Sequence, residues 1–227
     1  MYIDATMAPQ AYLFDLDGTL VDTERDNVES VVLAVRKLGA ELDADERRFV
    51  VGHSWNEIHA LIVRQHGLTI SMDDLIASAV EEKRRLMAEK GFTPLPGAVE
   101  AVRRFGRRAP LAVVSGASRV EVSDAIDGLG LRAHFRFLLG AEDYKRGKPD
   151  PEPYRSAVER LGVTAGRCIV LEDAQPGIQA ARAAGARVVG IRAGNFVGYD
   201  LSAADVVVDT LDEVTDELCD RLVDVVS

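Results

Sequence analysis

Short apolar runs alternate with segments of helical periodicity from about Gly97 to Ile191, and this alternation restricts the possible folds more than any other feature. The apolar runs cover residues 111–115, 137–139, 168–171 and 187–191. The helical segments between them cover residues 119–129, 151–161 and 177–184, each followed closely by a glycine of the kind that ends helices. Strands that alternate with helices favour a doubly wound parallel sheet.

A long helical stretch separates the first apolar run, residues 11–14, from the rest of the sheet. Ser54 with Glu57 three residues later is typical of a capping box at the start of a helix. The sequence therefore predicts an α/β fold with a Rossmann-like doubly wound parallel sheet as its core, built from residues 1–23 and 93–227. An α-helical cap domain, residues 24–92, is inserted into this core. Residues 206–208 are expected to form an edge strand, and Asp212 to begin a final helix.

Polar residues stand where the expected strands end. Asp15 and Asp17 follow the first run, Ser115 ends the second, and Glu172 with Asp173 ends the run at 168–171. In parallel α/β sheets, ligands bind outside the carboxyl ends of the strands. Two carboxylates two residues apart raise each other's pKa unless a cation or a proton separates them. The pattern thus indicates a metal ion and a reaction on an anion.

Each of these features also has a structural explanation when taken alone. The pair Asp17-Gly18 is common in turns, and Ser115 alone could cap a helix. A further candidate, Lys148, precedes Pro149 in the polar loop at residues 144–153, and alone it could be a solvated loop lysine. Glu172 and Asp173 could cap the helix that follows them. The ordered combination favours the functional interpretation.

The ordered set Asp15-x-Asp17-Gly18-Thr19, Ser115, Lys148-Pro149 and Glu172-Asp173 resembles the haloacid dehalogenase-like hydrolase superfamily. The segments 170–181 and 147–151 resemble its β-phosphoglucomutase-like and phosphatase branch, which carries a helical cap. The resemblance implies Mg²⁺-dependent hydrolysis of a phosphomonoester through an aspartyl-phosphate intermediate.

The resemblance also assigns roles to residues of this chain. Asp15 would be the nucleophile and Asp17 the general acid and base. The Ser115 hydroxyl, the Gly116 amide and backbone amides near Leu16 and Asp17 would bind phosphoryl oxygens, and Lys148 would balance charge.

A Mg²⁺ ion would be held by Asp15, the backbone carbonyl of Asp17 and the side chain of Asp173. Glu172 would be either a further ligand or a group behind the ligands, and the sequence leaves this open.

A sugar-phosphate mutase of the β-phosphoglucomutase type is the alternative function. In those mutases an arginine follows the cap's Gly-x-Ser, whereas Gly52-His53-Ser54 is followed here by Trp55, and Asn27 replaces a histidine of the first cap helix. These departures favour a phosphatase. Trp55 would face either the substrate or the cap core, and His53 and Asn27 are further candidates for substrate binding. A non-enzymatic phospho-acceptor or binding module is a remote alternative.

Composition restricts the partners. The net charge of −10 argues against a nucleic-acid backbone as ligand, and no apolar run is long enough to cross a membrane. Residues 1–10 lack the pattern of a secretion signal, and the two cysteines show no metal or redox spacing, so a cytoplasmic location is expected. We expect a small phosphorylated metabolite as substrate and a monomer or homodimer as the assembly.

Overall fold

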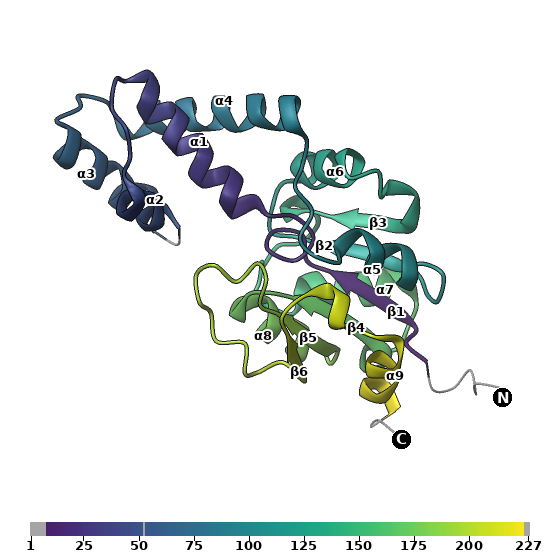
Figure 1. Cartoon of the computed structure of the whole chain (residues 1–227). Coiled ribbons are helices and arrows are strands. Elements are labelled where there is room, and N and C mark those ends of the chain that lie inside the picture. The colour runs from purple at the N-terminus through teal and green to yellow at the C-terminus, as the bar shows by residue number, and fades with distance from the viewer. Residues whose placement is uncertain (1–7, 52, 225–227) are drawn as a thin grey trace. The chain divides into compact units, whose positions relative to one another are not determined.

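The computed structural model describes residues 8–51 and 53–224, so most of the expected N-terminal tail (residues 1–10) and Gly52 lie outside the described residues. The chain divides into two compact units (Figure 1). Unit 1 is built from the described residues up to Asp22 and from Thr93 onward, and unit 2 is Thr23–Phe92. Among the described residues, no helix combines the length and the apolar character needed to cross a membrane.

Unit 1 contains a six-stranded sheet. Its strands are β1 (Ala11–Phe14), β2 (Leu111–Val114), β3 (Phe135–Leu139), β4 (Cys168–Glu172), β5 (Arg187–Ile191) and β6 (Val206–Val208). All strand pairs are parallel, and the order is β3-β2-β1-β4-β5-β6. The direction of winding reverses between β1 and β4, which is where ligands bind in sheets of this kind. The predicted α/β fold class is confirmed.

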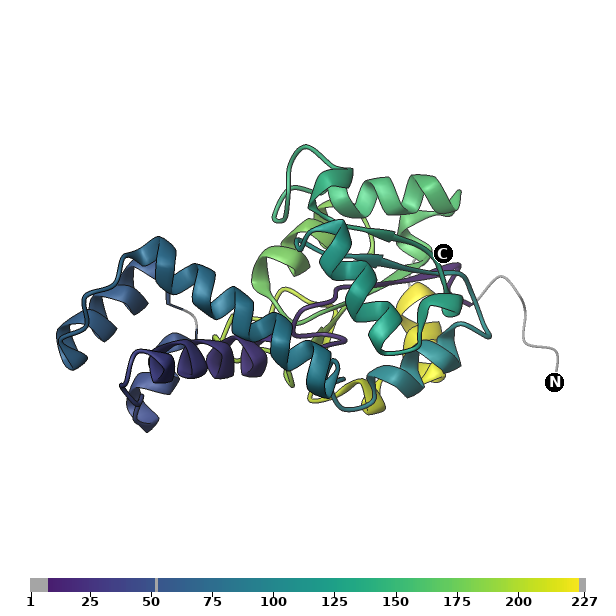
Figure 2. The ribbon, with the colours of Figure 1, turned by 90° about the horizontal axis from the view of Figure 1, so that it is seen from above.

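Helices cover both faces of this sheet (Figure 2). They are α5 (Ala98–Phe105), α6 (Arg119–Gly128), α7 (Glu152–Leu161), α8 (Gln175–Ala183) and α9 (Asp216–Asp224). On one face, Leu13 and Val170 share an apolar cluster with Tyr154 of α7 and Ile178 of α8. On the other face, the ring of Tyr12 stacks on Phe105 of α5 with the ring centroids 4.2 Å apart. Alternate residues of one buried strand thus pack against helices on opposite faces.

Four short 3₁₀ turns complete unit 1: η1 (Arg132–His134), η2 (Ala141–Asp143), η3 (Ala165–Arg167) and η4 (Leu211–Glu213). The last of these corrects the sequence prediction, because Asp212 lies in a 3₁₀ turn and α9 begins only at Asp216. The structure also starts α8 at Gln175 instead of residue 177, since Pro176 fits the first turn of a helix.

Unit 2 is helical among its described residues. It consists of α1 (Thr23–Lys37), α2 (Ala44–Val50), α3 (Trp55–His66) and α4 (Met72–Lys90), which enclose an apolar core of their own. The predicted capping box of Ser54 and Glu57 is present at the start of α3. Helix α2 was not predicted from sequence, although Asp43 and Glu46 form a second capping box at its start.

Candidate active site

The first strand ends in a tight turn that depends on Gly18. Asp15 directly follows β1, and its amide donates to the carbonyl of Leu171 at 3.0 Å, which extends the pairing with β4. Gly18 has a φ of +81°, and a Cβ atom there would lie 2.2 Å from Oδ2 of Asp173. Glycine therefore permits both the backbone turn and the close approach of Asp173.

Leu16 and Asp17 lie within this turn. The carbonyl of the buried Leu16 accepts hydrogen bonds from the amides of Leu20 at 2.8 Å and Val21 at 3.0 Å. The side chain of Asp17 is exposed, and its Oδ2 accepts a hydrogen bond from the Ser115 hydroxyl at 3.3 Å. The turn thus presents one carboxylate to the solvent side while Asp15 stays buried.

Three buried carboxylates form a cluster at the carboxyl ends of β1 and β4. Ligand oxygens of Asp15, Glu172 and Asp173 all lie within 4.8 Å of one another. Burial raises the pKa of Asp173 to about 7, and the charge of Glu172 adds to the rise. Burial also raises the pKa of Asp15 well above its ordinary value, although Lys148 opposes the shift. The cluster therefore favours either bound protons or a cation that neutralises the carboxylates.

Lys148 supplies part of that positive charge. It precedes Pro149 in the loop between η2 and α7 and is joined to it by a cis peptide bond. Its Nζ lies 2.5 Å from Oδ1 of Asp15 and 2.5 Å from Oε1 of Glu172, with the side chain only 12% exposed. Burial alone would lower the pKa of Lys148, but the two carboxylates outweigh it and raise the pKa well above its ordinary value. Lys148 is therefore charged at neutral pH.

Two further groups hold Glu172. The hydroxyl of Tyr154 donates to Oε1 at 2.9 Å, and the amide of Ala174 donates to Oε2 at 3.1 Å. Gly177 leaves room for the carboxylate, since a Cβ there would lie 1.6 Å from Oε1. Tyr154 is not among the site residues predicted from sequence. The sequence feature that could have identified it is a tyrosine on a helix predicted to pack against the sheet, because a buried tyrosine hydroxyl needs a hydrogen-bond partner.

Ser115 lies at the end of β2, on the other side of β1. Its hydroxyl donates to Asp17 and accepts from the amide of Ala117 at 3.0 Å. Gly116 is exposed and has open space where a side chain would stand. Tyr144, also missed from sequence, donates its hydroxyl to the carbonyl of Ser115 at 2.5 Å. The loop after β2 is therefore held from two sides while Gly116 stays accessible.

The carboxylates of this cluster suit a hard divalent cation. The buried cluster offers only carboxylate oxygens, the ligand type that suits Mg²⁺, and contains no histidine or cysteine. Asp173 accepts one hydrogen bond from the Thr19 hydroxyl at 3.1 Å on Oδ1. Both oxygens of Glu172 already accept hydrogen bonds, so Asp15 and Asp173 are the better candidates for direct ligands.

The sequence-predicted substrate residues of unit 2 are engaged within that unit. Trp55 is half-buried and packs against the apolar core of unit 2, the packing role that the sequence left open beside substrate contact. The ring of His53 stacks on Phe49 with centroids 3.7 Å apart. Oδ1 of Asn27 accepts a hydrogen bond from Nζ of Lys83 at 2.7 Å.

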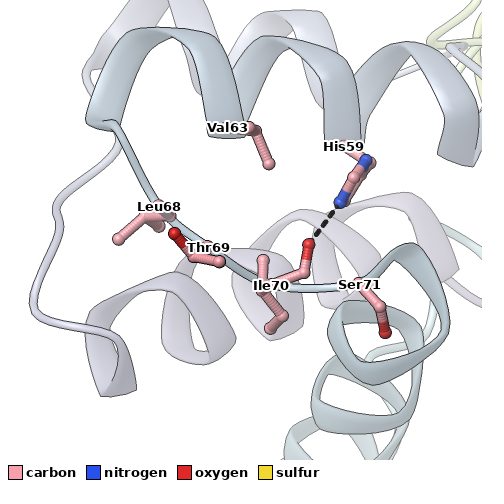
Figure 3. Close-up of a pocket in the computed structure, with 6 residues that line it drawn as sticks. All are labelled: His59, Val63, Leu68, Thr69, Ile70 and Ser71. Carbon is pink, nitrogen blue, oxygen red and sulfur yellow. Dashed lines mark hydrogen bonds between the residues drawn. The ribbon is translucent and has the colours of Figure 1, made fainter.

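Unit 2 also holds an open pocket of about 420 Å³ between α3 and the segment that leads to α4 (Figure 3). It is lined by His59, Val63, Leu68, Thr69, Ile70 and Ser71. A ring nitrogen of His59 lies 2.8 Å from the carbonyl oxygen of Ile70, a contact that ties α3 to the segment. None of the sequence-predicted site residues lines this pocket.

Buried carboxylates and a lysine at the switch point of a parallel sheet are typical of an α/β enzyme that binds a cation and acts on an anionic substrate. Residues 12–191 match the profile of the haloacid dehalogenase-like hydrolase family. The chain therefore belongs to the haloacid dehalogenase-like hydrolases.

Proteins of similar sequence or structure indicate the type of reaction within this family. Validoxylamine A 7'-phosphate phosphatase of Streptomyces hygroscopicus subsp. limoneus is 34% identical over 206 residues, covering 89% of this chain and 94% of its own length. Fructose-1-phosphate phosphatase YqaB of Escherichia coli is 31% identical, covering 79% of this chain and 95% of its own. A solved structure from Thermotoga maritima, provisionally described as a β-phosphoglucomutase, has a TM-score of 0.77 at 27% identity and covers 96% of this chain and 100% of its own. With phosphatases matching over most of its length, the chain is a phosphomonoester hydrolase of this family.

Proposed function

We propose that the chain is a Mg²⁺-dependent phosphatase that hydrolyses a small phosphorylated carbohydrate through an aspartyl-phosphate at Asp15. The observation that carries the proposal is the buried Lys148 ammonium, which contacts both Asp15 and Glu172. A carboxylate is a weak nucleophile toward a phosphate dianion, because the two repel each other. Fixed positive charge beside the carboxylate reduces this repulsion without any rearrangement during the reaction.

The first step forms a covalent bond to Asp15. A carboxylate oxygen of Asp15 attacks phosphorus, and the bond between phosphorus and the ester oxygen breaks. Asp17 gives a proton to the leaving oxygen, so the alcohol departs neutral. Asp17 is exposed, and the hydrogen bond that it accepts from the Ser115 hydroxyl places its carboxylate beside the proposed phosphate-binding groups, within reach of a leaving oxygen or an incoming water. The Ser115 hydroxyl and the open Gly116 amide are the proposed donors to phosphoryl oxygens.

The second step releases phosphate. Asp17, now ionised, takes a proton from a water molecule as its oxygen attacks phosphorus, and the bond from phosphorus to Asp15 breaks. Lys148 stays paired with Asp15 and stabilises the carboxylate as it is regenerated. Asp15, Asp173 and the carbonyl of Asp17 would hold the ion. Bound there, Mg²⁺ would supply positive charge that offsets the repulsion between the carboxylates and the substrate dianion.

The proposed substrate class rests on the similar phosphatases. Two of them carry the names of fructose 1-phosphate and validoxylamine A 7'-phosphate as substrates. Unit 2 would act as the cap predicted from sequence, which excludes water from the site and contacts the part of the substrate that is not phosphate. Asn27, His53 and Trp55 remain the candidates for that contact.

Mutase activity is the second candidate, because of the structural likeness to the Thermotoga maritima protein. A mutase must hold a second phosphate group, which needs cationic donors. Trp55 and Asn27 stand where the resemblance places an arginine and a histidine in mutases, and this argues for hydrolysis.

Phosphate release from a panel of sugar phosphates and other small phosphomonoesters tests the proposal. We expect turnover with Mg²⁺, none with a chelator, and a loss of at least about 10³-fold in Asp15→Asn, which keeps the shape but not the nucleophile. Asp124→Asn, an exposed change in α6, is the matched control.

Isomerisation of hexose phosphates in the presence of a bisphosphate primer is measured in parallel. Isomerisation faster than hydrolysis would make the chain a mutase. No reaction of either kind, with folded protein and Mg²⁺ present, would contradict the proposal and favour a binding role.

A further inference from the structure

Tyr154 lies behind the charged groups of the site and is absent from the set of residues that the mechanism uses. It stands in the first turn of α7, and its side chain is fully buried. Its hydroxyl donates to Oε1 of Glu172 at 2.9 Å. Its ring lies under Lys148, whose Nζ is 5.0 Å from the ring centroid. One side chain thus touches both partners of the Lys148–Glu172 ion pair.

The position of Lys148 depends on where Glu172 points. Oε1 of Glu172 accepts hydrogen bonds from both Lys148 and Tyr154, while Oε2 accepts from the amide of Ala174. The Ala174 amide holds only Oε2, so the carboxylate can turn about that oxygen unless a donor on a rigid support also holds Oε1. The Tyr154 hydroxyl is that donor. Lys148, on a flexible four-carbon stem, follows the oxygen that Tyr154 holds.

We propose that Tyr154 is a positioning residue: its hydroxyl orients Glu172 so that Glu172 holds the Lys148 ammonium against Asp15. The inference rests on the proposed function, because it takes Asp15 as the nucleophile. It also assigns Glu172 to the support of Lys148 instead of direct coordination of the metal. The role is separate from packing, since a phenylalanine ring would fill the same space.

Tyr154→Phe removes only the hydroxyl, and Tyr12→Phe is the matched control. Tyr12 is also a fully buried tyrosine of unit 1, but its hydroxyl has no hydrogen-bond partner among the described residues. Hydrogen-bond partners that orient metal ligands are typically worth about 10- to 100-fold in activity, and we expect the same order for a group that orients the charge beside the nucleophile. We expect kcat of Tyr154→Phe to fall by about 10-fold or more, with KM changed by less than about 2-fold, and Tyr12→Phe to keep the kcat of the wild type.

A double-mutant comparison separates positioning from packing. If the hydroxyl acts through Glu172, adding Tyr154→Phe to Glu172→Gln causes little further loss of kcat. Losses that multiply would overturn the proposal. So would a Tyr154→Phe enzyme with unchanged kcat, or one whose Mg²⁺ affinity, measured by calorimetry, falls by about 10-fold while single-turnover phosphoryl transfer at saturating Mg²⁺ is normal.

A crystal structure of Tyr154→Phe grown with Mg²⁺ gives an answer that does not depend on activity. We expect Glu172 to turn and its contact with Lys148 to be lost. An unchanged chain of contacts from Glu172 through Lys148 to Asp15 would overturn the proposal. Wild-type protein that releases no phosphate from any ester would instead contradict the proposed function, and the crystal structure would still test the positioning role.

Discussion

At Gly18 two separate requirements act on one residue. The backbone needs a φ of +81°, and Oδ2 of Asp173 lies 2.2 Å from where a Cβ would stand. Gly130 shares only the first requirement, because it has a φ of +67° and no atom within 4 Å of such a Cβ. We expect the left-handed backbone to cost both Gly18→Ala and Gly130→Ala about 1–2 kcal/mol of unfolding free energy, and Gly18→Ala to lose more because Asp173 must also move.

Activity should separate these two variants. Gly18→Ala pushes Asp173 away, so phosphatase activity should fall by about 10²-fold or more, and Gly130→Ala should stay near the wild type. Urea unfolding and steady-state kinetics measure the two effects. An active Gly18→Ala enzyme would mean that Asp173 can move without consequence.

Asp173 should make the effect of Mg²⁺ depend on pH. Burial raises its pKa from 3.8 to about 7 in the metal-free protein. Because the folded pKa lies above the unfolded one, the metal-free fold loses stability as the pH rises from about 4 to about 7, and the loss is constant above that. Mg²⁺ needs the ionised carboxylate, so we expect it to raise the melting temperature more at about pH 8 than at about pH 5.5.

Thermal melts with Mg²⁺ and with a chelator measure this difference. Asp173→Asn should abolish the Mg²⁺ effect at both pH values, whereas the exposed Asp124→Asn should keep it. An equal Mg²⁺ effect at the two pH values would show that Asp173 does not take up a proton in this range.

At the scale of elements, the start of α3 depends on a side-chain cap. The amide of Glu57 lies 3.5 Å from the Ser54 hydroxyl, and the amide of Ser54 donates to the Glu57 carboxylate at 2.9 Å. Ser54→Ala should lower the free energy of unfolding by about 1 kcal/mol, while Ser54→Asn should retain most of it. Urea unfolding followed by the emission of Trp55, the single tryptophan, reports on this unit directly. Equal stability of the two variants would contradict a capping role.

Some of these elements and contacts could be predicted from the sequence, and others could not. Strand β5 and the box at Ser54 were predictable because each depends on a local pattern of apolar or capping residues. The sequence also predicted that Asp15, Lys148 and Asp173 lie in one site, since parallel strands bring their carboxyl ends to the same edge of the sheet. The contact of Tyr154 with Glu172 was not predictable, because it depends on which residue of α7 faces the end of β4. Periodicity gives the buried face of a helix but not its axial position on a sheet.

At the scale of the whole molecule, unit 2 is inserted at two neighbouring points of unit 1. The amide of Asp22 donates to the carbonyl of Thr93 at 2.9 Å, so the points where the chain leaves unit 1 and returns to it lie side by side. Unit 2 encloses its own apolar core, and the sheet with its helices encloses another. Replacing residues 23–92 by a short glycine-serine loop therefore closes a small gap at little entropic cost.

We expect the shortened chain to fold and to keep its stabilisation by Mg²⁺, because the carboxylate cluster belongs entirely to unit 1. It should still hydrolyse a reactive aryl phosphate but lose about 10²-fold or more in kcat/KM for the best substrate of the panel, because the proposed cap, which would exclude water and contact the rest of the substrate, is gone. Circular dichroism, Mg²⁺-dependent melting and kinetics on both esters measure these three properties. Equal losses on both esters, in a shortened chain that folds and still responds to Mg²⁺, would mean that unit 2 serves the chemical step itself and not the choice of substrate.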